Sequence, residues 1–204
     1  MNRSVDRVRA KVAKPRGESP LAERFALFAE CLLTGVWIAV AALPLVTYPA
    51  AFAAGSRHLR RRTAHVGGGL REFVADFRAA LRGGWLVGLV GWAALAAVWV
   101  DVRAVRAGIP GGPLVGAVGV LALIGAAVTV LRAAAVWEPG ASWRALLGAA
   151  GRRTVLDPAG SFLVVGGLVV VACSAWFTAP LALPVLGAVA AAALAVEERY
   201  RRRS

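Results

Sequence analysis

The stretch Pro158–Val196 reads PAGSFLVVGGLVVVACSAWFTAPLALPVLGAVAAAALAV and contains no Asp, Glu, Lys or Arg. A helix needs about 20 apolar residues to cross the roughly 30 Å of hydrocarbon in a bilayer, so this stretch is long enough for two crossings. Cys31–Ser56, Gly83–Val100 and Pro113–Leu131 are equally free of charge. A chain of this size cannot hide four such blocks in a soluble core. Because helices satisfy every backbone polar group in lipid, the sequence predicts an all-α transmembrane bundle.

Composition and charge support a membrane protein over a soluble one. Of the 204 residues, 59% are hydrophobic and only 17% are charged, against about a quarter in most soluble domains. The net charge of +13 would suggest nucleic acid in a soluble protein. Here, however, Lys and Arg stand at the edges of the apolar blocks. We therefore expect them to contact the lipid bilayer and its anionic lipids, with no nucleic-acid partner.

The apolar pattern predicts five spans and one short helix. The spans are expected over Leu21–Leu43, Gly84–Val100, Leu114–Ala135, Phe162–Phe177 and Val185–Val196. The domain order is a disordered basic cytoplasmic tail (1–20), a transmembrane helical domain (21–198) and a basic cytoplasmic C-terminus (199–204). The short helix would follow the break at Pro44, with Thr47 as its cap and Pro49 in its first turn. A short exterior loop is expected over Asp101–Gly112.

The distribution of Lys and Arg predicts the orientation of the chain. The basic segments Arg57–Arg82 and Arg144–Arg153 should lie in the cytoplasm together with both termini. Both flanks of Cys31–Ser56 then lie inside, so the chain must turn at Leu43-Pro44 and return. Whether residues 44–56 span fully or re-enter stays open. Non-helical backbone at this depth requires cover from other helices or a cavity to line.

Two further segments are amphipathic. Over Gly68–Gly83, one helix face carries apolar residues and the other carries charges; the apolar set is Leu70, Phe73, Val74, Phe77 and Leu81, and the charged set includes Arg71, Glu72, Asp76, Arg78 and Arg82. Over Ser142–Arg153, the residues Trp143, Leu146, Leu147 and Ala150 share a face. Such helices either lie in the cytoplasmic membrane interface or pack on the protein's own bundle.

Candidate functional residues are few. Glu30, about two turns into the first span, is a candidate intramembrane charge, because ionisable residues within membranes often serve function. Its alternative position is the membrane interface. Leu43, Pro44, Thr47 and Pro49 form a candidate functional turn, since broken helices line the binding sites of many transporters.

Other polar and aromatic residues are expected to serve solvation and anchoring. His58 and His65 should be solvated in the basic segment, and Arg132 should snorkel from the end of its span. Trp85, Trp99, Trp137 and Trp176 stand near span ends, as membrane-anchoring tryptophans do. The pair Gly84 and Gly88 permits close helix contact.

No motif of enzymatic or metal chemistry is present. The chain contains no Cys-x-x-Cys, His-Glu-x-x-His, phosphate-binding glycine loop or nucleophile elbow. We therefore expect no cofactor, no metal site and no enzymatic activity.

Two stretches carry a resemblance to a known family. Trp37–Ala54, WIAVAALPLVTYPAAFAA, and Phe73–Arg78, FVADFR, resemble the YesL-like family of bacterial membrane proteins. That family is multi-spanning, and its Trp-containing first helix ends in Leu-Pro and Thr before a small-residue helix. Leu33-Thr34-Gly35 stand where the family often has Asn. The resemblance implies a multi-pass protein of the bacterial cell membrane; some members lie beside sugar-uptake genes, and no functional residues come with it.

Two functions follow as expectations. The first is a non-enzymatic accessory or assembly component linked to sugar transport, with a transporter subunit or a second copy as its partner. The second is a small transporter or channel that acts as an oligomer, with the Leu43–Pro49 break lining its site. A transporter should expose polar groups to a cavity, and the spans offer few of them.

Overall fold

The computed structural model describes residues 20–64, 66–108, 111–177 and 179–202. Over these residues the chain forms helices and no strand, which confirms the predicted all-α fold. The helices are α2 (Pro20–Ala41), α3 (Tyr48–Thr63), α4 (Leu70–Arg106), α5 (Gly112–Ala135), α6 (Trp143–Leu156), α7 (Pro158–Phe177) and α8 (Ala179–Arg201). The predicted tail 1–20 lies outside the described residues apart from Pro20, where α2 begins.

The chain divides into two compact units, Met1–Glu30 and Cys31–Ser204. The boundary falls within α2, so the described part of the first unit is the beginning of that helix. The second unit contains the rest of α2 and the helices α3 to α8. Helix α8 continues to Arg201, so the described part of the predicted basic end 199–204 is largely helical.

Helix α3 is the short helix predicted after the proline break, and it is deeply buried in the second unit. Its alanines Ala50, Ala51, Ala53 and Ala54 are fully buried. The helix packs against α4, α5 and α8. Because alanine has a small side chain, neighbouring helices can approach the α3 backbone closely.

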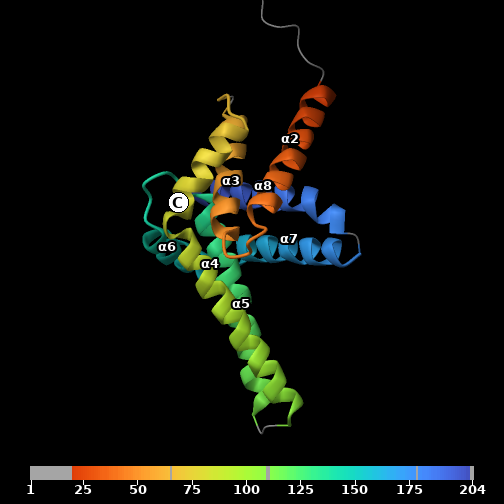
Figure 1. Cartoon of the computed structure of the whole chain (residues 1–204), viewed down its shortest axis with the longest axis vertical. Helices are drawn as coiled ribbons and strands as arrows, with labels where there is room; N and C mark the ends of the chain where they lie inside the picture. Colours follow the sequence, from red (N-terminus) through yellow and green to blue (C-terminus); the bar gives the residue numbers. More distant parts are fainter. Residues whose placement is uncertain (1–19, 65, 109–110, 178, 203–204) are drawn as a thin grey trace, which may run out of the picture. The chain divides into compact units, whose positions relative to one another are not determined.

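Helices α4 and α5 run side by side as a hairpin (Figure 1). Helix α4 is broken at Arg82 and Gly83, whose backbone angles are not helical, with φ of 121° at Gly83. The break separates the amphipathic part of α4 from its apolar part. It therefore lies where the sequence predicts the end of one helix and the start of a span.

The far end of the hairpin differs from the prediction. Helix α4 continues to Arg106, so the first half of the expected loop Asp101–Gly112 is helical. The guanidinium carbon of Arg103 lies 5.4 Å from the centre of the Trp99 ring. This cation–π contact stabilises the last turns of α4 beyond the apolar block, which the sequence pattern alone does not indicate.

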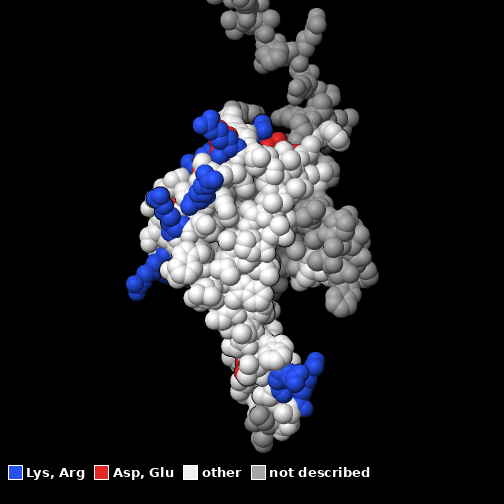
Figure 2. Space-filling model, in the orientation of Figure 1, with Lys and Arg blue, Asp and Glu red and all other residues white. Residues whose placement is uncertain are grey.

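The surface of the hairpin suits a membrane. Figure 2 shows Lys and Arg gathered towards two ends of the molecule's second unit, with an uncharged surface between them. Exposed apolar side chains of α4 and α5 include Leu86, Leu89, Val90, Trp92, Leu95, Leu114, Val118 and Leu121. At 1.5 Å per residue, Arg82 and Arg103 stand about 31 Å apart along α4, close to the ~30 Å of a bilayer core.

Within the part of the chain that the structure describes, fewer candidate spans are found than the sequence predicts. By length and composition, α4 and α5 can each cross a membrane. Helices α6 and α7, bent by 104° at the break between them, would count as a third if they form one broken span. Helices α7 and α8 lie side by side and run across the direction of α4 and α5 (Figure 1). Five spans are therefore not confirmed.

Both predicted amphipathic helices pack on the bundle. Phe73 on α4 is 3% exposed, and its ring centre lies 5.4 Å from that of Trp37. On α6, Trp143 and Ala150 are buried, and the Trp143 indole donates to the Ala80 carbonyl at 3.0 Å. Both helices therefore pack on the protein's own helices, which was one of the two predicted arrangements.

Candidate functional site

The predicted functional turn connects α2 to α3. Leu43 is exposed, whereas Pro49 is buried in the first turn of α3. Thr47 stands at the N-cap position, but its hydroxyl donates to the Ala41 carbonyl at 2.6 Å. The predicted capping of α3 by this side chain is therefore wrong. The backbone of Thr47 is α-helical (φ −89°, ψ −1°), whereas a capping residue is usually extended. Its hydroxyl instead satisfies a backbone carbonyl at the end of α2.

The turn that contains Pro44 contacts α4 through Val46. A Cβ atom at Gly88 would lie 1.8 Å from the carbonyl oxygen of Val46, so only glycine allows this approach. Leu45 adopts a left-handed conformation with φ of 61° to complete the turn. The bundle therefore covers only the end of the turn at Val46, whereas Leu43, Pro44 and Leu45 are exposed; the cover expected for irregular backbone in a membrane is found in part.

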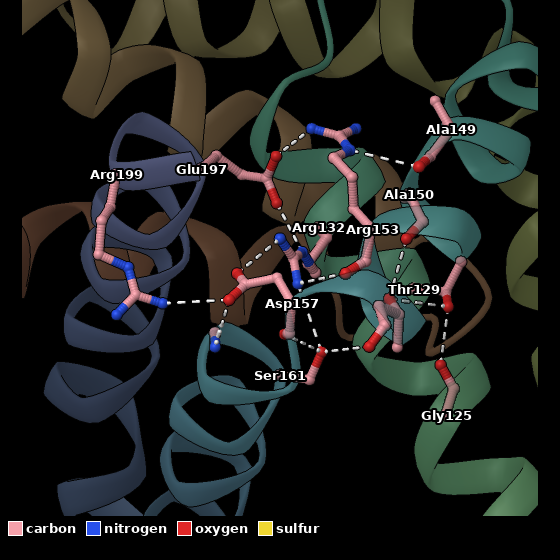
Figure 3. A network of polar contacts seen from close by, with 12 residues as sticks. Gly125, Thr129, Arg132, Ala149, Ala150, Arg153, Asp157, Ser161, Glu197 and Arg199 are labelled. Carbon is pink, nitrogen blue, oxygen red and sulfur yellow. Dashed lines mark hydrogen bonds and ion pairs between the residues drawn. The ribbon is translucent and has the colours of Figure 1, made fainter. Parts of the chain in front are cut away.

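The main polar network surrounds Arg132 near the end of α5 (Figure 3). The Arg132 side chain is fully buried. Its Nε donates to Oε1 of Glu197 on α8 at 2.6 Å, and its Nη2 lies 3.3 Å from Oδ2 of Asp157 at the α6–α7 corner. Its Nη1 donates to the Arg153 carbonyl at 3.2 Å and to the Ser161 hydroxyl at 3.3 Å. One side chain therefore joins α5, the corner and α8.

Two more arginines complete this Arg132 network. Arg153 pairs with the second carboxylate oxygen of Glu197, and Arg199 lies 3.3 Å from the second oxygen of Asp157 (Figure 3). Three guanidinium groups against two carboxylates leave one excess positive charge. Buried ions persist only where partners replace the water that they lose. The network therefore holds the ends of four helices, α5, α6, α7 and α8, in one arrangement.

The predicted snorkelling of Arg132 is wrong. Glu197 follows the apolar part of α8, and Asp157 follows the last residue of α6. Both carboxylates lie at the end of α5 that carries Arg132. The ion pairs of Arg132 with these carboxylates replace the contact with interfacial water on which snorkelling depends. A signal for this network is present in the sequence: Glu197 directly follows the last predicted span, on the side of the membrane where the charge rule predicts the end of Leu114–Ala135.

A second network surrounds Asp76 on α4. This residue is 4% exposed, although the helical pattern places it on the charged face. Arg57 and Arg61 of α3 pair with its carboxylate, and Nη1 of Arg61 lies 2.9 Å from Oδ2. Since α3 covers this face of α4, solvation of Asp76 is replaced by two ion pairs. The helical pattern alone could not reveal that cover.

Arg60 and Trp137 link α3 to the end of α5. The Arg60 guanidinium donates to the carbonyl oxygens of Ala135, at 2.7 Å, and of Trp137. A cation in this place complements the free carbonyls at a helix C-terminus. The Trp137 side chain is 2% exposed, so its predicted role as a membrane anchor is wrong.

His58 differs most from its predicted environment. Its side chain is fully buried on α3, and its ring lies edge-on to Trp37 with 5.0 Å between ring centres. The prediction of a solvated His58 is wrong because α3 continues into the basic segment and turns this residue towards the core. His65 lies outside the described residues.

An apolar cavity of about 580 Å³ opens between α4, α5 and the start of α6. We call it the α4–α6 groove. Leu86, Val90 and Leu123 are among its apolar lining, and the set also includes Tyr48, the first residue of α3. The predicted turn therefore leads directly into a wall of this groove.

The described residues offer little for metal or redox chemistry. No group of three or more His, Cys, Asp or Glu within this part of the chain could hold one metal ion. Cys31 and Cys173 are free thiols. Glu30 lies on α2 at the end of the first unit, and its role as an intramembrane charge stays a prediction.

Comparison of the chain with protein-family models, with curated proteins and with solved structures finds no match. The resemblance to the YesL-like family accordingly stays a prediction based on the residues quoted above.

Proposed function

We propose that this chain is a non-enzymatic integral membrane protein that serves as an accessory or assembly component of a transport system. The observation that supports this most directly is the separation of polar and apolar surface. The buried charged side chains are paired in the Arg132 and Asp76 networks, whereas the exposed faces of α5 and of α4 beyond its break at Gly83 are largely apolar. Such faces suit contact with lipid and with helices of a partner. Sugar uptake is the process that the YesL-like resemblance suggests.

We place the chain in a bacterial cell membrane with five spans and both termini in the cytoplasm. The Arg132 network brings the ends of α5 and α8 together, and Arg60 brings the end of α3 to the same place. These ends are the basic ones, which favours the cytoplasmic side. The absence of charge over Pro158–Val196 favours α7 and α8 as further spans, and five spans require these two helices to lie along the direction of α4 and α5 instead of across it (Figure 1).

The accessory function can be tested by copurification. A tagged chain extracted from its native membranes in mild detergent should bring down a multi-spanning transport subunit in a constant ratio. The subunit should be identified by mass spectrometry after cross-linking in intact membranes. Recovery of the chain alone, with cross-links only to itself, would contradict the proposal.

The alternative is a small transporter or channel that acts as an oligomer. The observation that favours it is the position of Tyr48, which follows the helix break and lines the α4–α6 groove. Its hydroxyl would lie 2.9 Å from a Cβ atom at Gly91, so the phenol reaches across to α4. Purified protein in liposomes should then carry a flux of sugars or ions that a Tyr48→Phe variant alters. No flux beyond that of empty liposomes would exclude this alternative for the solutes assayed.

A further inference from the structure

The α4–α6 groove has a depth that matches one leaflet of a bilayer. Its α4 wall runs from Gly83 to Ala94, which is about 16 Å at 1.5 Å per residue. Half of a ~30 Å hydrocarbon core is about 15 Å. The cavity volume of about 580 Å³ lies within the usual range of roughly 300–1,000 Å³ for sites that bind small molecules.

The groove is basic at one end and apolar along its length. Arg82 and Arg144 line it where α4 breaks and α6 begins. Both are exposed, and neither forms an ion pair or hydrogen bond with another residue in the part of the chain that the structure describes. By contrast, Arg57, Arg61 and Arg132 are committed to carboxylates. The two rim arginines are thus available to an external anion.

The start of α6 adds to the positive potential at this rim. Ser142 is the N-cap residue of α6, and its side chain makes no capping hydrogen bond. The first backbone N–H groups of a helix carry partial positive charge and suit an anion. Ser142 itself lines the groove beside Arg144.

From these features we infer that the α4–α6 groove binds one anionic phospholipid, whose place in the cytoplasmic leaflet rests on the orientation proposed above. The phosphate lies between Arg82 and Arg144, and an acyl chain follows the apolar wall towards Ala94. A partner helix is a poorer fit, because a helix about 16 Å long and about 10 Å wide occupies roughly 1,250 Å³, more than twice the cavity volume of about 580 Å³. A water-soluble phosphate would leave the apolar length of the groove unused.

The test uses the full chain in detergent and native mass spectrometry with phosphatidylglycerol, phosphatidylcholine and glycerol phosphate as separate probes. We expect one phosphatidylglycerol to bind, phosphatidylcholine to bind more weakly, and glycerol phosphate not to bind. In R82Q/R144Q the affinity for phosphatidylglycerol should fall about 30-fold, since each arginine near an anionic headgroup contributes roughly fivefold. The matched control is R78Q/R152Q, which removes two exposed arginines that do not line the groove; its affinity should stay within about twofold.

A second variant tests the apolar wall without changing charge. A94F/A126F fills the groove from α4 and α5 and should lose phosphatidylglycerol while keeping the thermal unfolding temperature of the parent. Three results would overturn the inference: equal binding of the two phospholipids, binding of glycerol phosphate as tight as that of phosphatidylglycerol, or equal losses in R82Q/R144Q and R78Q/R152Q. Retention of the lipid by a folded A94F/A126F would also overturn it. None of these readouts depends on a transport partner.

Discussion

At the scale of single residues, Arg132 lies at the centre of the largest polar network described above. It is fully buried and bonded to Glu197 and Asp157. Replacing it with Ala leaves two carboxylates short of a partner, and breaking a buried pair in this way costs about 3–5 kcal/mol. We expect R132A to lower the free energy of unfolding by that amount, measured by equilibrium unfolding in mixed detergent micelles.

The matched control for Arg132 is Arg202 on the surface. Its pair with Glu198 has side-chain exposures of 79% and 58%, so R202A should leave stability unchanged. A double-mutant cycle with R132M and E197M should also be strongly non-additive, because the two side chains share one interaction. Equal stabilities of R132A and R202A would show that the Arg132 network does not stabilise the bundle.

Gly88 is the residue on which the contact between Val46 and α4 depends. A methyl group there would meet the backbone oxygen of Val46 at 1.8 Å, and a backbone atom cannot move aside cheaply. We expect G88A to destabilise the protein by about 1–3 kcal/mol, the usual cost of overpacking. Gly125 on α5 has nothing within 4 Å of such a methyl group. G125A should therefore keep or slightly raise stability, and a loss equal to that of G88A would contradict the packing.

At the scale of helices, Trp143 ties α6 to the break in α4. Its indole donates to the Ala80 carbonyl at 3.0 Å, and its ring lies against Gly83 and Gly84. Truncation of a buried tryptophan costs about 3–5 kcal/mol, so W143A should unfold far more easily in the same micelle assay. W143F keeps most of the packing but leaves Ala80 without its indole donor, and should fall between W143A and the parent. Indistinguishable stabilities of W143F and W143A would show that the packed ring contributes nothing.

The helices could largely be predicted from the sequence, because apolar periodicity and proline breaks are properties of one segment. The break at Gly83 and the burial of Phe73 are examples. The environments of Asp76, His58 and Arg132 could not, since each depends on which other helix covers that face. The α4–α6 groove is lined by residues from several helices, so it likewise could not be predicted from single segments.

At the scale of the whole molecule, the second unit has one end where the buried networks meet and another where α4 turns into α5. Arg60 and Arg132 mark the first end, and Arg103 and Arg106 mark the second. The orientation of the protein can therefore be determined by labelling one residue at each end. Ser56, at the end of the uncharged block Cys31–Ser56, is fully buried and therefore unsuited to chemical labelling.

Ala64 and Ala107 are better reporters of orientation, because both are exposed at opposite ends of the spans. In a background with Cys31 and Cys173 replaced by Ala, a membrane-impermeant maleimide applied to intact spheroplasts should label A107C, whereas A64C should react only after permeabilisation. The reason is the excess of arginine around Ala64, which retains that segment in the cytoplasm. The same assay on A182C tests the number of spans. Labelling of A182C from outside requires that the chain cross the membrane twice within Pro158–Val196. Labelling only after permeabilisation would show that α7 and α8 are not spans. Labelling of A64C in intact spheroplasts would reverse the orientation, and with it the leaflet assigned to the groove lipid.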